Sequence, residues 1–71
     1  MDAGLLRTIW SVIEETPAYY LQRVSPGEQV RLLLKRVENK VMLSAPERVE
    51  THQYLHERRT MIREMSLEQV M

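Results

Sequence analysis

Apolar residues recur at three- and four-residue intervals through most of the chain, a spacing that predicts helices rather than strands. The first helix is expected to begin after Asp2, which would cap it. The Thr16-Pro17 step is expected to end it, because proline lacks an N–H group and disfavours helical backbone at the preceding residue. The same step favours a short helix over residues 17–23, with Thr16 as its N-cap. The apolar positions of the first helix are Leu5, Leu6, Ile9, Trp10, Val12 and Ile13.

Two Ser-x-x-Glu sequences indicate the later helix starts, because the serine and the glutamate can each bind a backbone N–H of the first turn. Ser25 and Glu28 precede a third helix, which Asn39 is expected to end. Ser44 and Glu47 precede one long helix, expected over residues 45–65. The apolar stripe of the third helix consists of Val30, Leu33, Leu34, Val37 and Val41.

The sequence therefore predicts an all-α fold: a small bundle of three main helices plus one short helix. Residues 1–65 are expected to form a single domain. A further start signal at Ser66 leaves too few residues for another helix, so a frayed tail is expected over residues 66–71.

Composition narrows the possible functions. The 71 residues include ten Lys and Arg balanced by ten Asp and Glu, and 44% are hydrophobic, which argues against a disordered chain. Without cysteine there is no disulfide, no cysteine-based zinc site and no thiol nucleophile. No apolar run is long enough for a membrane span or a signal peptide, so the expected location is cytoplasmic.

Small size makes a partner the expected source of additional stability. Domains of this length bury only about 60% of the surface that their unfolded chain exposes. Disulfides, metals and partner chains are the usual supplements to such a small core. With disulfides excluded, a second copy of the chain or another protein is the ordinary solution.

Candidate chemistry is sparse. His52 and His56 are four residues apart and would share a helix face, as zinc ligands can. That face also carries Arg48, Arg59 and Arg63, which repel a cation, so no metal site is predicted. The adjacent Glu14 and Glu15 diverge on a helix, and no glycine-rich phosphate loop is present. No catalytic residue, cofactor or enzymatic activity is predicted.

Nucleic-acid binding is the alternative function. The segment from Val30 to Arg63 contains eight basic residues and four acidic ones. It also contains two predicted helices with a short connection, as in helix-turn-helix DNA-binding proteins. The neutral whole chain counts against it, since phosphate binding rests on a strongly basic surface. The basic residues are Arg31, Lys35, Arg36, Lys40, Arg48, Arg58, Arg59 and Arg63.

The expected long helix carries an apolar stripe between two charged borders, which is how a helix specifies a partner helix. The acidic border consists of Glu50, Glu57 and Glu64, and the basic border of Arg48, His52, His56, Arg59 and Arg63. The alternative is an ordinary salt-bridged surface helix. In a homodimer, each acidic border would meet a basic one.

Further interaction candidates lie in the short helix and in the stripes. Tyr19, Tyr20 and Arg23 are of the residue types enriched at interfaces, although one tyrosine could instead close the core. Trp10 is expected in the core. Leu32 lies off the stripe of its helix and is an expected contact.

Arg58 lies within the apolar stripe of the long helix and needs a partner if it is buried. A carboxylate, with Glu14 or Glu15 as candidates in the same chain, is the preferred partner. Snorkelling to solvent is the alternative.

The sequence also resembles a known group of proteins. The residues that carry the resemblance are Gly4-Leu5-Leu6-Arg7-Thr8-Ile9-Trp10, Val12-Ile13-Glu14-Glu15-Thr16, Leu43-Ser44, Glu47, Tyr54-Leu55, Arg58 and Ile62-Arg63-Glu64. They resemble small uncharacterised all-helical proteins of cyanobacteria. The resemblance implies a cytosolic helical protein and assigns no site residue. The function expected from the sequence is a helical protein–protein interaction module: an assembly factor, adaptor or regulator.

Overall fold

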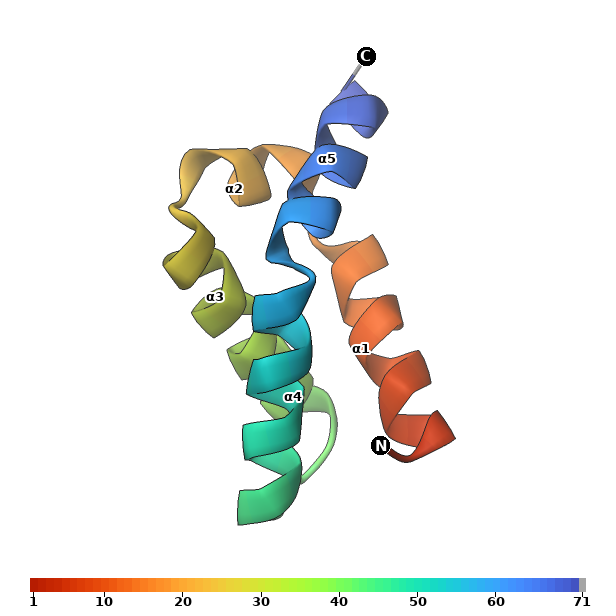
Figure 1. Cartoon of the computed structure of the whole chain (residues 1–71). Coiled ribbons are helices and arrows are strands. Elements are labelled where there is room, and N and C mark those ends of the chain that lie inside the picture. The colour runs from red at the N-terminus through yellow and green to blue at the C-terminus, as the bar shows by residue number, and fades with distance from the viewer. Residues whose placement is uncertain (71) are drawn as a thin grey trace.

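Five helices make up the chain in a computed structural model that describes the backbone of residues 1–70 and the side chains of residues 1–65. They are α1 (Ala3–Glu15), α2 (Ala18–Arg23), α3 (Pro26–Lys40), α4 (Ala45–Glu57) and α5 (Arg59–Val70). Helices α1, α3 and α4 form one end of the molecule, while α2 and α5 pack together at the other (Figure 1). No strand occurs within residues 1–70, which confirms the all-α prediction.

Both Ser-x-x-Glu sequences begin helices as predicted. Ser44 Oγ accepts a hydrogen bond from the Glu47 N–H at 3.3 Å, and the Glu47 carboxylate accepts one from the Ser44 N–H at 2.9 Å. Ser25 Oγ accepts from the Glu28 N–H at 3.3 Å. These contacts satisfy N–H groups that the first helical turn cannot pair internally.

The predictions at the ends of α1 and α3 need correction. Asp2 stands at the N-cap of α1 but makes no side-chain capping bond. Thr16 caps the C-terminus of α1 rather than the N-terminus of α2: its buried hydroxyl donates to the Val12 carbonyl at 2.7 Å. Pro17 is the N-cap of α2. Helix α3 continues through Asn39 to Lys40.

The single long helix predicted over residues 45–65 is wrong. The chain bends at Arg58, whose backbone angles are φ −106° and ψ 9°, so that α4 and α5 are separate helices. The bend lets α5 pack against α2, a long-range contact that local periodicity does not encode. The backbone is helical to Val70, through most of the expected tail, and Met71 lies outside the described residues.

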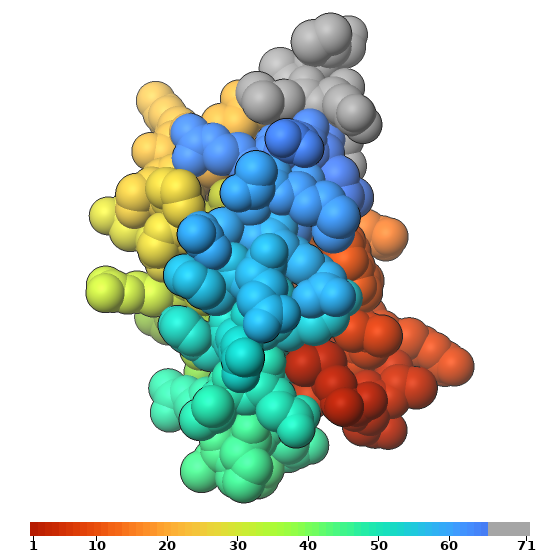
Figure 2. All heavy atoms as spheres, in the orientation of Figure 1, coloured from red at the N-terminus to blue at the C-terminus, as the bar shows by residue number. Residues whose placement is uncertain are grey.

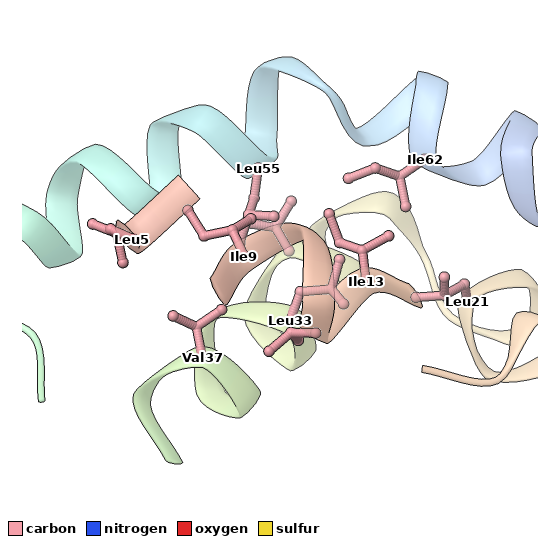
Figure 3. Close-up of a cluster of buried hydrophobic side chains, with 10 residues drawn as sticks. Leu5, Ile9, Ile13, Leu21, Leu33, Val37, Leu55 and Ile62 are labelled. Carbon is pink, nitrogen blue, oxygen red and sulfur yellow. The ribbon is translucent and has the colours of Figure 1, made fainter. Parts of the chain in front are cut away.

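The core draws side chains from all five helices. Ile62 of α5 points into the same cluster as Ile9 of α1, Leu33 of α3 and Leu55 of α4 (Figure 3). Trp10, expected inside, is partly buried and packs against the edge of this cluster. The buried apolar side chains are Leu5, Ile9, Val12, Ile13, Leu21, Val30, Leu33, Val37, Leu55 and Ile62. Among the described helices, none has the length and apolar character to cross a membrane.

Candidate interaction surfaces

A pair of exposed tyrosines forms the outer surface of α2. The rings of Tyr19 and Tyr20 stack with centroids 4.3 Å apart, and the side chains are 51% and 43% exposed. The hydrogen bond with the Tyr20 hydroxyl raises the pKa of Tyr19. Leu21, the next residue, is buried and fixes the helix to the core, so the two tyrosines before it face outward. Neither tyrosine closes the core, and Arg23 at the end of α2 is also exposed.

Arg63 holds α2 in place from α5. Its guanidinium donates to the carbonyl oxygens of Gln22 and Val24, each at 3.3 Å, at the C-terminal end of α2. Arg63 is half-buried. The sequence placed it on a solvent-facing basic border, and the bend at Arg58 turns it inward instead. Arg63 therefore stabilises the surface that α2 presents.

Gln29, which sequence reasoning missed, is fully buried beneath the α4–α5 bend. Its Nε2 donates to the Arg59 carbonyl at 3.2 Å. Its Oε1 is buried and has no hydrogen-bond partner among the described residues. Its spacing in the sequence could have indicated that it is buried. Gln29 lies four residues before Leu33 and eight before Val37, on the buried stripe of α3.

Trp10, Tyr54 and Arg58 link α1 to α4. The Trp10 Nε1–H donates to the Tyr54 hydroxyl at 2.8 Å, and the two rings meet edge to face. Arg58 lies over the Tyr54 ring, with Cζ 3.8 Å from its centroid. The guanidinium also lies 3.9 Å from the Glu57 carboxylate, and its side chain is 38% exposed.

The expected pairing of Arg58 with Glu14 or Glu15 is not what the structure shows. Glu15 pairs with Lys40 at 2.6 Å, and the hydrogen bond from Lys40 lowers the pKa of the Glu15 carboxyl. The position of Arg58 at the bend directs its side chain onto the tyrosine ring. Its charge is stabilised by that ring, by the neighbouring Glu57 carboxylate and by solvent.

The two histidines lie side by side on the exposed face of α4. The rings of His52 and His56 are nearly parallel, with centroids 6.3 Å apart. Within the described part of the chain, no group of three or more His, Asp or Glu side chains is placed to hold a metal ion. Arg59, expected beside them, donates to the His56 carbonyl from its side chain and is half-buried.

Most basic residues between Arg31 and Arg63 contact other groups of the chain. Arg48 pairs with Glu38 at 3.1 Å, and Lys40, Arg58, Arg59 and Arg63 make the contacts given above. Arg31 and Lys35 line a shallow pocket on α3 together with Leu34, Glu38 and Arg48. The acidic side chains Glu50 and Glu57 line a separate hollow with Met1, Gln53 and Tyr54.

Other apolar side chains are also exposed. Met42, in the loop between α3 and α4, is 96% exposed, and Val49 on α4 and Met61 on α5 are exposed as well. Leu32, an expected contact, is half-buried on α3. In the space-filling view α4 and α5 cover the front of the molecule, with the N-terminal residues beside α4 (Figure 2). The tyrosine pair is distinguished from these single side chains by its ring stacking.

Comparison with known proteins found no matching family model, no matching curated protein and no matching solved structure. What the fold and the described side chains define is therefore a small all-helical protein with an exposed aromatic surface on its shortest helix.

Proposed function

We propose that the chain is a helical protein–protein interaction module without catalytic activity, and that α2 provides its contact surface. The observation that carries this proposal is the stacked, exposed pair Tyr19–Tyr20 on a helix that is fixed to the core. The partner is another protein or a second copy of the chain, in the cytoplasm. Assembly factors, adaptors and regulators act through such surfaces.

Two properties of the tyrosine pair favour binding: its large contact area and the restricted motion of its rings. A tyrosine brings a large amphipathic surface to an interface with few rotatable bonds, so ordering it costs little entropy. Stacking restricts the two rings further before any partner arrives, which lowers the cost of binding. Helix α2, which carries the rings, is fixed by the bonds from Arg63 and by the buried Leu21 side chain. Arg23 adds an exposed charge beside the rings, as at the polar rims of interfaces.

A matched pair of variants tests the surface. Tyr20→Ala removes one ring of the pair, whereas Met42→Ala removes an even more exposed apolar side chain from the α3–α4 loop. Affinity capture from native cells and sedimentation equilibrium at micromolar concentration are compared for both variants and the unaltered chain. We expect the partner or the self-association to be lost with Tyr20→Ala and kept with Met42→Ala. Equal behaviour of all three proteins would refute the assignment of α2.

Nucleic-acid binding through the basic residues between Arg31 and Arg63 is less well supported. Lys40 and Arg48 are paired with carboxylates, and Arg63 is directed to backbone carbonyls inside the fold. A titration of generic duplex DNA with salt separates the two functions. A nucleic-acid binder loses affinity steeply with the logarithm of salt concentration, whereas we expect essentially no binding even at low salt.

A further inference from the structure

A shallow pocket between α3 and α4 brings three positively charged side chains together. Arg31 and Lys35, one helical turn apart, line it from α3, and Arg48 lines it from α4. All three residues are exposed. Leu34 and Glu38 complete the lining, and the pocket has a volume of about 320 Å³. These five residues are called the α3–α4 pocket below.

The positive charge of the α3–α4 pocket is only partly balanced. Its one carboxylate, Glu38, pairs with the Arg48 guanidinium at 3.1 Å. Arg31 and Lys35 make no hydrogen bond or ion pair with any residue whose side chain the structure describes. With three positive side chains and one negative, the pocket has two positive charges in excess.

The contact with Glu38 also orients Arg48 before any ligand binds. It engages Nε, on one edge of the planar guanidinium, so N–H groups on the far edge remain for an anion. Two N–H groups on one edge of a guanidinium bind two oxygens of a carboxylate or phosphate at once. Because Glu38 already restricts the arginine, less side-chain entropy is lost when an anion binds.

Charge and size favour a phosphate monoester as the ligand. At neutral pH this group carries close to two negative charges and has three strong acceptor oxygens. It therefore balances both excess charges of the pocket, whereas a carboxylate or a phosphodiester balances one. Small-molecule sites measure about 300–1,000 Å³. The pocket is at the small end of this range and has room for one phosphorylated group, with Leu34 beside the carbon atoms that carry it.

We propose that the α3–α4 pocket binds a phosphate monoester through Arg31, Lys35 and Arg48. The ester belongs either to a phosphorylated side chain of a partner protein or to a small phosphorylated metabolite, and the chemistry of recognition is the same for both. The pocket is formed by α3 and α4, so the proposal does not depend on the tyrosine pair of α2.

Titration with inorganic phosphate, followed by amide chemical shifts in NMR, tests the site. At a constant ionic strength of about 0.15 M, we expect saturable shifts around the pocket, with a Kd on the order of 1 mM for so small a ligand. A phosphoserine peptide and glycerol phosphate distinguish the two sources of the ester. A peptide that binds at least about tenfold more tightly identifies a phosphorylated partner, and the reverse order identifies a metabolite.

Single substitutions assign the binding to the pocket. Arg31→Gln and Lys35→Gln should each weaken phosphate binding by about tenfold, because each removes a charge-assisted hydrogen bond. The matched control is Arg36→Gln, which removes one positive charge from the same helix outside the pocket. In the same buffer its effect should be less than about twofold. Circular dichroism establishes that each variant folds.

Three results would overturn the proposal. One is the absence of saturable shifts in the unaltered chain up to about 20 mM phosphate. Another is equal weakening by Lys35→Gln and Arg36→Gln, which would mean that phosphate responds to overall charge rather than to the pocket. The third is glutamate or duplex DNA that binds the pocket as tightly as phosphate does, because the dianionic ester would then have no preference.

Discussion

Replacing Gln29 with methionine tests whether the buried amide beneath the α4–α5 bend stabilises or destabilises the fold. Methionine has nearly the same length and shape, so packing is retained while both polar atoms are removed. The substitution loses the Nε2 bond to the Arg59 carbonyl, a net contribution of about 1 kcal/mol. It also removes the buried Oε1, whose desolvation without a partner costs about 1–3 kcal/mol. The expected outcome is a stability gain of about 1 kcal/mol.

The measurement is thermal unfolding followed by circular dichroism, supported by urea titration. For a domain of this size, 1 kcal/mol corresponds to an increase in Tm of roughly 4–8 °C. Gln29→Ala serves as the control, because it removes the same polar atoms but leaves a cavity, and it should be about 2–5 kcal/mol less stable than Gln29→Met. A loss of more than about 1 kcal/mol in Gln29→Met would refute the reasoning. It would mean that the amide as a whole stabilises the fold.

Four further predictions concern single hydrogen bonds at helix ends and between α1 and α4. Ser44→Ala should cost about 1 kcal/mol in urea unfolding, and a cost of zero would exclude Ser44 as the cap of α4. The hydrogen bond from the Ser44 N–H holds the pKa of the Glu47 carboxyl below its usual value near 4.5. The stability from this contact is therefore present at neutral pH and is lost as the pH falls through the lowered pKa. Glu47→Gln should make the free energy of unfolding less dependent on pH in this acidic range. Tyr54→Phe should cost about 0.5–1.5 kcal/mol through the lost bond from Trp10, an effect that a Trp10→Phe background should abolish. Arg63→Met should speed amide exchange in α2 relative to α3, and equal protection in both helices would contradict its role.

Local chemistry is what the sequence predicts well in this protein. The serine caps at Ser25 and Ser44 and the break at Pro17 depend on a few neighbouring residues, and all three mark helix boundaries in the structure. The apolar spacing identified the core faces of α1 and α3. Which helix a capping residue serves was harder to predict, because Thr16 can cap the helix before it or the one after it. In the structure its hydroxyl donates to the Val12 carbonyl, so it caps the helix before it.

What the sequence could not predict depends on contacts between distant residues. The bend at Arg58 arises because α5 packs on α2, so the periodic pattern extended the helix past it. Because of that error, the expected environments of three arginines were wrong. Arg58 contacts the Tyr54 ring rather than Glu14 or Glu15, and Arg63 binds the end of α2 rather than facing solvent. Arg59 contacts the His56 carbonyl at the bend. Gln29 was missed because a polar residue in an apolar stripe carries no local sign of a partner thirty residues away.

Two long-range contacts also shape how the chain folds. The Trp10–Tyr54 bond closes a loop of 44 residues, and the Arg63–Gln22 bond closes one of 41. The two loops overlap, so once one contact forms, the shortest path between the ends of the other contains roughly half as many residues. Halving a loop lowers its closure cost by about 0.6 kcal/mol. Each contact therefore promotes the other through chain entropy, so the two ends of the molecule are coupled in folding beyond the core that they share.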